Sequence, residues 1–228
     1  MKTFKQFLFE SNRFTSMSKF SFVEQVRDSC SEFLKANDIS ENANCLYRGI
    51  KKGSTDLYIH AAPRLNRAPS DMPQRYHNAI DEYFSENFGF KYRSGGTFTT
   101  NSKNASMAYG APYLFIPMDG YKLCGSDRVE DLYSEMDANP IKTILGIKEN
   151  DPKYDDLTLD LRDLKIGDST DRTIMNKIMD SANYFESKKV EEFGQNEIMV
   201  QCKGFYMMQF SDTGYENVTE DVIQELYK

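Results

Sequence analysis

The sequence of 228 residues contains no tryptophan, only two histidines and only four cysteines. The cysteines are Cys30, Cys45, Cys124 and Cys202. They form no Cys-x-x-Cys pair and no cluster with a histidine, which excludes the usual spacings of a structural zinc site and of a disulfide framework. We therefore expect reduced thiols, as in a cytosolic setting, and no bound metal. Neither His60 nor His77 stands in the setting of a recognisable Ser-His-Asp hydrolase.

The sequence also lacks a long apolar run and an excess of basic residues. No segment stays apolar over the ~20 residues that a membrane-spanning helix needs, so we expect no membrane partner. Lysine plus arginine number 28 against 35 aspartates plus glutamates, for a net charge of −7. This balance argues against a sequence-independent nucleic-acid binder, which needs a broad basic face, but it leaves room for a local basic pocket.

The residues that are present indicate one globular domain of the α+β class. Helical periodicity predicts helices from a Ser21–Glu24 capping box through Leu34, over 73–88 and 127–136, from about 172 and from 219. Alternation and β-branched content predict strands over 45–50, 56–60, 97–100, 113–116, 121–124, 197–201 and 205–210. Because helices gather early and strands late, we expect a mainly antiparallel sheet.

Turn residues indicate which strands follow one another directly. The segments 113–116 and 121–124 flank Pro117–Gly120 and are expected to pair as a hairpin. The segments 197–201 and 205–210 are likewise expected to be consecutive strands joined by the turn Lys203-Gly204. The polar, acidic stretch 149–171 is expected to form a long loop or insertion.

The N-terminus divides into a short apolar-basic segment and a polar stretch. Residues 1–10, MKTFKQFLFE, are too short in their apolar part for a secretory signal, and no small-residue cleavage site follows. Residues 11–19 are polar and predict a linker. The remainder, 20–228, is expected to fold as a single domain.

The first of three motifs is Tyr47-Arg48-Gly49 in the strand 45–50. An arginine among apolar strand residues requires an anionic partner, and its guanidinium fork suits a phosphate or a carboxylate. The glycine that follows would let a ligand approach the backbone. A structural ion pair at the end of a strand explains the same residues.

The second motif is Phe98-Thr99-Thr100-Asn101-Ser102, which leads into a short helix. Its hydroxyls offer donors and acceptors to a sugar. Threonine is also a good strand former and Ser102 a good helix N-cap, so the motif has a purely structural explanation as well.

The third motif is Gln195-Asn196-Glu197 at the start of the strand 195–202. Alternation along a strand would place Gln195 and Glu197 on one face and send Ile198 and Val200 to the core. The polar pair would then face a cleft, although an edge strand facing solvent has the same pattern.

In this order and at these separations, the three motifs resemble those of the arginine-serine-glutamate class of mono-ADP-ribosyltransferases. The family pattern is an aromatic-Arg-Gly strand, a Phe-x-Ser-Thr-Ser strand that enters a helix, and a (Gln/Glu)-x-Glu strand. The resemblance spans about residues 45–210. It implies an ADP-ribosyltransferase-like fold of two packed, mainly antiparallel sheets with an N-terminal helical part. Two departures are the Thr-Asn-Ser of the middle motif and the initial Gln195, which in the family accompanies target residues other than arginine.

The resemblance also implies roles for individual residues, with NAD as the substrate and no metal. Arg48 would pair with the phosphates, the Gly49 backbone would hold the nicotinamide carboxamide, and Glu197 would stabilise the positive charge that develops on the ribose. Gln195 would orient the incoming protein nucleophile. The remaining candidates would line the nucleotide; they are Phe98, Thr99, Thr100 and Ser102, with Arg64 and Arg67 as secondary candidates for the adenosine phosphate.

The N-terminal segment is similar to the capsid-targeting peptides of large tailed phages. Leu8-Phe9-Glu10 before Ser11 resembles a prohead-protease site, so cleavage would fall between Glu10 and Ser11. The resemblance implies a monomer that is packaged in the phage head, enters the host cytoplasm and modifies a host protein. An ordinary short amphipathic helix explains the segment equally well.

Two other functions stay open at this point. One is a non-catalytic packaged protein that keeps the fold and binds or inhibits a host defence enzyme. The other is a structural head protein without a ligand.

Overall fold

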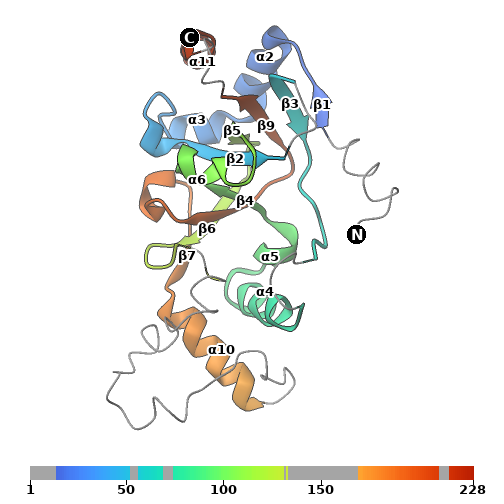
Figure 1. Ribbon diagram of the computed structural model, residues 1–228, viewed down its shortest axis with the longest axis vertical. Coiled ribbons are helices and arrows are strands. Elements are labelled where there is room, and N and C mark those ends of the chain that lie inside the picture. Colours follow the sequence, from blue (N-terminus) through green and yellow to red (C-terminus); the bar gives the residue numbers. More distant parts are fainter. Residues whose placement is uncertain (1–13, 52–55, 69–73, 131, 133–168, 211–215) are drawn as a thin grey trace.

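The computed structural model describes residues 14–51, 56–68, 74–130, 132, 169–210 and 216–228 (Figure 1). Within them the chain is α+β with a large antiparallel sheet, as the sequence predicted, and it has several helices. The predicted helix over 127–136 and the predicted loop over 149–171 fall largely outside the described residues. Residues 1–13 also lie outside them.

In the described part of the chain, nine strands form the sheet. Their bounds are β1 Phe14–Ser16, β2 Leu46–Ile50, β3 Tyr58–Ala61, β4 Thr97–Thr100, β5 Ala111–Pro117, β6 Lys122–Ser126, β7 Tyr184–Ser187, β8 Glu197–Gln201 and β9 Phe205–Gln209. The seven strands that the sequence predicted are all present, and β4 and β8 have the predicted bounds. β1 and β7 carry no strong alternation of their own.

The strand order is β1-β3-β9-β5-β2-β4-β8-β6-β7, and every register pair is antiparallel. One register pair, Tyr47 with Thr100, joins β2 to β4, whereas neighbouring strands elsewhere share three or more. The sheet is therefore divided into a half of five strands and a half of four strands, which meet at this narrow junction.

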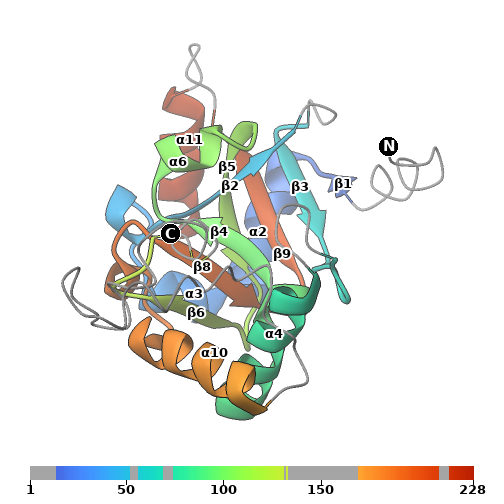
Figure 2. The same ribbon diagram turned by 60° about the horizontal axis from the view of Figure 1, so that its bottom comes forward.

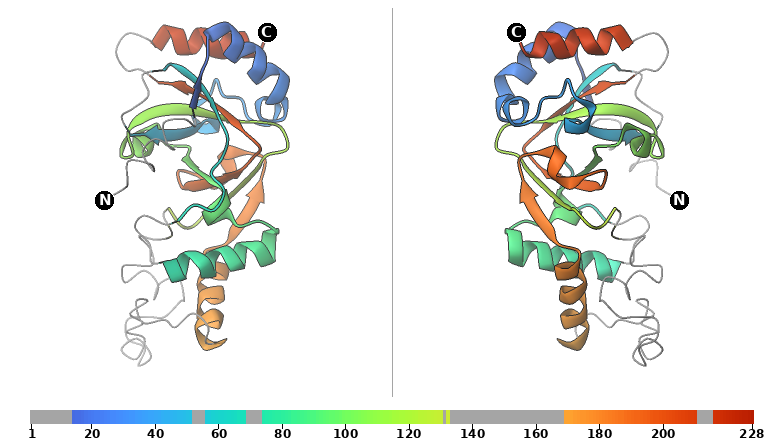
Figure 3. Two further views of the ribbon diagram at one scale, coloured as in Figure 1. Left: turned by 90° about the vertical axis from the view of Figure 1, so that its right-hand side faces the viewer. Right: turned by 90° about the vertical axis from the view of Figure 1, so that its left-hand side faces the viewer.

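The helices gather at the two ends of the molecule (Figure 3). Their bounds are α2 Lys19–Ser29, α3 Ser31–Ala36, α4 Gln74–Phe88, α5 Tyr92–Gly95, α6 Lys103–Met107, α10 Ser169–Ser181 and α11 Glu216–Leu226. α2, α3 and α11 lie at one end, and α4 and α10 lie at the other. α4 ends as predicted, with Gly89 at φ +72°, a left-handed conformation that favours glycine.

Two hydrophobic cores lie on the two faces of β8. Ile198 and Val200 belong to the larger core, with α2, α3 and the five-strand half, whereas Met199 belongs to the core under α4, α5 and α10. The predicted alternation along this strand is therefore correct. Ile198, Met199 and Val200 of β8 are therefore buried on both faces of the strand, and the half-buried Glu197 stands at its start, where this burial stops.

Two predictions about the N-terminal region are wrong. Ser18, and not Ser21, caps α2, because the backbone N–H of Ser21 donates to the Ser18 hydroxyl at 3.2 Å. In the proposed linker 11–19, β1 pairs with β3, with Phe14 opposite Ala61. The polar composition of residues 14–16 is typical of an edge strand, which carries polar side chains on its solvent-exposed side.

Both predicted hairpins are also wrong. β5 pairs with β2 and β9, and β6 pairs with β7 and β8, so the two strands around Pro117–Gly120 belong to different halves of the sheet. β8 and β9 are separated in the same way. The two connections run side by side, and the backbone N–H of Met118 donates to Gly204 O at 3.0 Å.

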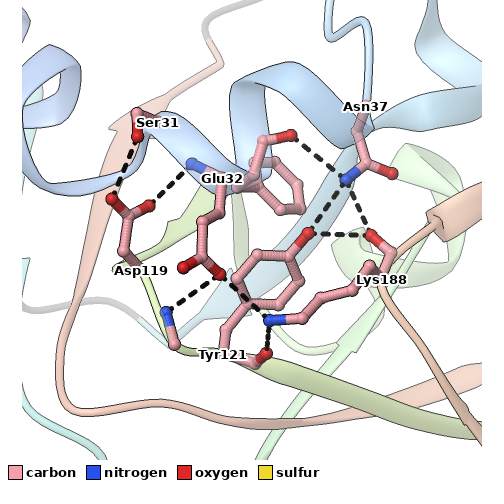
Figure 4. Close-up of polar contacts among 8 residues, drawn as sticks. Ser31, Glu32, Asn37, Asp119, Tyr121 and Lys188 are labelled. Atoms are coloured by element: carbon pink, nitrogen blue, oxygen red, sulfur yellow. Dashed lines mark hydrogen bonds and ion pairs between the residues drawn. The ribbon is translucent and has the colours of Figure 1, made fainter.

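Helix α3 holds the first of these crossing connections in place (Figure 4). Asp119 accepts from the Glu32 backbone N–H at 2.8 Å and from the Ser31 hydroxyl at 3.1 Å, which satisfies the start of the helix. At the other end, the buried Asn37 amide donates to Lys188 O at 3.0 Å, which the Tyr121 hydroxyl also reaches at 2.8 Å. These contacts outweigh the local tendency of 117–120 to form a tight hairpin.

Candidate functional site

The three motifs meet at one place, where β4 lies between β2 and β8 (Figure 2). Thr100 is the register partner of Tyr47 on β2 and of Glu197 on β8. Arg48 directly follows Tyr47. The three motifs therefore lie in three adjacent strands, at the same end of those strands. Segments that are far apart in the sequence thereby form a single cluster.

Arg48 is half-buried on β2, and its guanidinium points toward β4. Its Nη1 donates to the carbonyl oxygen of Phe98 at 2.6 Å. This bond fixes the side chain across the narrow junction between the two halves of the sheet. Arg48 therefore has a structural contact of its own, and its guanidinium also contributes positive charge to the site.

Glu197 forms an ion pair that the sequence did not predict. Its Oε1 lies 3.0 Å from Nη1 of Arg93 on α5, and the side chains are 24% and 10% exposed respectively. The backbone of Arg93 is itself held, because its N–H donates to Oδ1 of the buried Asp81 on α4 at 2.8 Å. Asp81 also accepts from the backbone N–H and the hydroxyl of Ser94.

Phe98 is the common surface for two arginines. The Arg67 guanidinium carbon lies 3.8 Å from the ring centroid, and that of Arg93 lies 4.7 Å from it. Such contacts contribute roughly 0.5–2 kcal/mol each as the cation loses water. Arg67 also donates from Nη2 to the carbonyl oxygen of Arg93 at 3.3 Å, which links the loop 63–68 to α5.

The electrostatics of the cluster favour an anion. Burial lowers the pKa of Arg67 to about 10, and the positive charges of Arg48, Arg93 and Arg64 act in the same direction. Glu197 is the carboxylate that opposes them. The Glu197 carboxylate thus stands among guanidiniums whose like charges repel each other, those of Arg48, Arg64, Arg67 and Arg93. An anionic ligand would reduce the repulsion among these guanidiniums.

The hydroxyl residues of the second motif divide between the two faces of β4. Thr99 is buried, and its hydroxyl donates to Ile198 O at 2.8 Å, so it lies on the face opposite to Phe98 and Thr100. Thr100 accepts from the Ser102 backbone N–H at 3.1 Å. Ser102 caps α6 as predicted, with its hydroxyl accepting from the Ala105 N–H at 3.2 Å.

Gly49 is required by a contact within the protein. A Cβ at this position would lie 2.0 Å from Ser106 O and 2.8 Å from Cβ of Tyr109. The absent side chain lets the α6 segment pack directly against β2. The space that the sequence suggested for a ligand at this glycine is thus taken up by the segment that follows the second motif.

Gln195 lies in the turn before β8 and not in the strand, so its predicted alternation with Glu197 does not apply. Its side chain is exposed, and its backbone oxygen accepts from the Thr100 hydroxyl at 3.5 Å. The structure thus brings Gln195 beside Thr100 and Glu197 through the turn. Arg64 is half-buried in the loop before Arg67, and its charge acts on that arginine.

Arg93 and Asp81 are the two site residues that the sequence reasoning missed. Arg93 belongs to the segment Lys91–Gly96, whose Arg-Ser-Gly-Gly letters predict a solvent-exposed turn. Asp81 lies in the strongly periodic helix α4, where it is buried together with Ile80 and Phe84. A polar residue on the apolar face of a helix was the available signal for Asp81.

The environments of the cysteines and of His77 do not favour a nucleophilic thiolate or a protonated imidazole. Burial raises the pKa of Cys45 to about 11 and that of Cys30 and Cys202 to about 12, which suppresses the reactive thiolate. Burial also raises the pKa of Cys124. His77 is buried beside Asp81, with Nε2 3.5 Å from the carboxylate, and desolvation lowers its pKa.

Among the described residues, no group of three or more histidine, cysteine, aspartate or glutamate side chains could hold a metal ion. In the same part of the chain, no helix is long and apolar enough to cross a membrane. Comparison of the chain with protein-family models, curated proteins and solved structures finds no match.

Proposed function

We propose that this protein is a mono-ADP-ribosyltransferase that moves ADP-ribose from NAD to a side chain of a host protein. One observation carries the proposal: Tyr47, Thr100 and Glu197, from three separate motifs, lie in one register row across β2, β4 and β8. An arginine, a hydroxyl and a carboxylate then stand at one end of three adjacent strands. These are the groups that a dinucleotide with a nicotinamide leaving group on its ribose requires.

The charges of the cluster suit the charges of NAD. The diphosphate carries two negative charges, and Arg48 with Arg67 would balance them on the Phe98 side of the site. The bond between nicotinamide and ribose breaks with its electron pair leaving on the nicotinamide nitrogen, so positive charge develops on the ribose. The Glu197 carboxylate would stabilise that charge, in the manner of the glycosidase carboxylates.

The second product forms when a nucleophile of the target protein bonds to the ribose carbon and loses its proton. Gln195, exposed at the turn before β8, would orient that nucleophile. The Gln-x-Glu order of the third motif favours a target residue other than arginine. The division of the sheet at Tyr47 and Thr100 suits two packed sheets of the ADP-ribosyltransferase kind, which we include in the proposal.

The N-terminal sequence motif extends the proposal to the setting of the protein. Leu8-Phe9-Glu10 before Ser11 would direct the chain into a phage head, from which it would reach the host cytoplasm. A host protein would then be the acceptor.

The test is to incubate the full chain with NAD that carries a label in its adenylate phosphate, with and without host lysate. We expect release of nicotinamide and a labelled protein band that appears only with lysate. If neither nicotinamide release nor labelling occurs, the transferase function is wrong. Capture of a host enzyme by the inactive chain would then favour the non-catalytic inhibitor.

A further inference from the structure

We infer that Arg93 is a positioning residue for Glu197, and that α4 presents it for this role through Asp81. The inference rests on the proposed function, in which Glu197 stabilises the developing charge on the ribose. It adds to the three motifs a fourth segment, Tyr92–Gly95, that none of them contains.

In the ion pair, Arg93 is the more buried partner and Glu197 the more exposed one. The Arg93 side chain is 10% exposed, whereas that of Glu197 is 24% exposed. The Arg93 backbone N–H is bound by Asp81 at 2.8 Å, and its guanidinium lies against the Phe98 ring. Arg93 is therefore fixed on both sides before it contacts the carboxylate. The Glu197 backbone is held as well, because its N–H donates to Glu130 O at 3.0 Å, so the ion pair joins two fixed segments.

The contact of Arg93 with Oε1 restrains the direction of the Glu197 carboxylate. The bond from Arg93 Nη1 at 3.0 Å fixes the direction of the side chain, because a carboxylate is planar and its two oxygens move together. The same contact places a positive charge directly beside the Glu197 carboxylate. Preorganisation of this kind is what a group needs in order to stabilise charge that exists only in the transition state.

Arg93 carries a further sign of a functional position. Within the described part of the chain, its Nε is a buried donor without a hydrogen-bond partner. Buried donors are rarely left in this state, and each one calls for an explanation. An arginine placed only for stability would direct its full fork at acceptors; here Nη1 is committed to the glutamate.

Three other readings give different kinetic results. If Arg93 bound the NAD diphosphate directly, its loss would raise KM and leave kcat nearly unchanged. If the ion pair restrained Glu197 in an inactive position, loss of Arg93 would increase turnover. If the pair were merely structural, stability would fall while kcat would not follow.

The experiment measures nicotinamide release by the full chain and by Arg93→Ala and Arg93→Lys. We expect Arg93→Ala to lower kcat on the order of 10²-fold with a change in KM of less than about threefold. Arg93→Lys should retain more activity than the alanine variant, because it keeps the charge but loses the fork.

Chemical rescue separates positioning from a folding defect. Guanidinium at roughly 50 mM should restore part of the activity of Arg93→Ala, whereas at any concentration it weakens the folded state and so cannot act by refolding the variant. Arg128→Ala, at an exposed arginine on the same half of the molecule, is the control and should show no rescue.

The outcomes distinguish the two proposals. Absence of turnover in the unmodified chain overturns the proposed function and this inference with it. If the unmodified chain turns over NAD and Arg93→Ala has an equal or higher kcat, the inference alone is overturned. The same holds if Arg93→Ala loses activity only through a higher KM. Failure of guanidinium to restore any activity to Arg93→Ala also overturns it.

Discussion

Thr100 on β4 and Glu197 on β8 are register partners, although nearly half of the sequence lies between them. The pairing brings the hydroxyl motif and the carboxylate motif to the same end of the sheet. Tyr47 completes the row from the other side, and with it comes Arg48. The following predictions test what this row and the charges around it do.

Glu197→Gln should lower the rate of NAD hydrolysis on the order of 10²-fold or more, because it removes one preorganised charge. The glutamine oxygen can still accept from Arg93, so the melting temperature should stay within about 4 °C. Steady-state nicotinamide release and thermal unfolding measure both effects. Glu192→Gln, at an exposed glutamate before β8, is the matched control. Full activity in Glu197→Gln would remove this residue from the catalytic role.

Arg48→Lys should weaken NAD binding, because lysine keeps the positive charge but loses the planar fork. It should also lose the bond to Phe98 O, so we expect a decrease of about tenfold in affinity, or roughly 1.4 kcal/mol. Isothermal titration calorimetry with NAD measures it. Arg128→Lys provides the control at an exposed position. Equal affinities for the unmodified chain and Arg48→Lys would reduce Arg48 to a structural contact.

Thr100→Val should lower NAD turnover, whereas Thr100→Ser should keep it. Valine has nearly the shape of threonine but cannot accept from the Ser102 N–H or donate to Gln195 O. Serine retains the hydroxyl and matches the family pattern. The loss of these two hydrogen bonds predicts a cost in stability of about 2 kcal/mol for the valine variant. Equal turnover in both variants would mean that the hydroxyl has no part in the reaction.

The stability of the folded chain should fall as the pH drops below about 6.5, in part because of His77. Its pKa is lowered in the folded state by burial, so the unfolded chain takes up the proton first, and protonation favours unfolding. Asp81 opposes this shift, while the charges of Arg93 and Arg67 reinforce it. His77→Phe should therefore lose less stability between about pH 7.5 and pH 5.5 in thermal unfolding.

His60 is the natural comparison for that measurement, because burial lowers its pKa as well. His60→Phe should remove its own share of the pH dependence and leave the share of His77 in place. A pH dependence in His77→Phe that equals that of the unmodified chain would contradict the prediction.

Deletion of residues 1–10 should change the melting temperature by no more than a few degrees, since a removable peptide cannot carry the core. Deletion of residues 1–16 should cost more, because it removes β1 and uncovers the edge of β3. Thermal unfolding of the two truncated chains gives the comparison. In mature particles the chain should begin at Ser11. An intact Met1 there, or a collapse of stability on the shorter deletion, would make the N-terminus an ordinary structural segment.

Local patterns were sufficient wherever an element is specified by its own residues. The helix α4 follows from the spacing of Tyr76, Ile80 and Phe84, and β4 and β8 have the bounds predicted for the strands 97–100 and 197–201. Ser102 was predicted as a cap because capping depends on one side-chain oxygen and a backbone N–H two or three residues further on. For such features the interacting groups are close in sequence, so the sequence alone decides them.

Only the tertiary structure decided which strands pair and which charges meet. The turns at Pro117–Gly120 and Lys203-Gly204 look like hairpins locally, yet each connection crosses between the two halves of the sheet. Long-range contacts such as those of Asp119 with α3 hold the first connection there. The same long-range packing brings Arg93 to Glu197 from a segment that looks like an exposed turn. Ion pairs between distant segments leave no periodic trace in a sequence, since their energy depends on a distance that the whole fold sets.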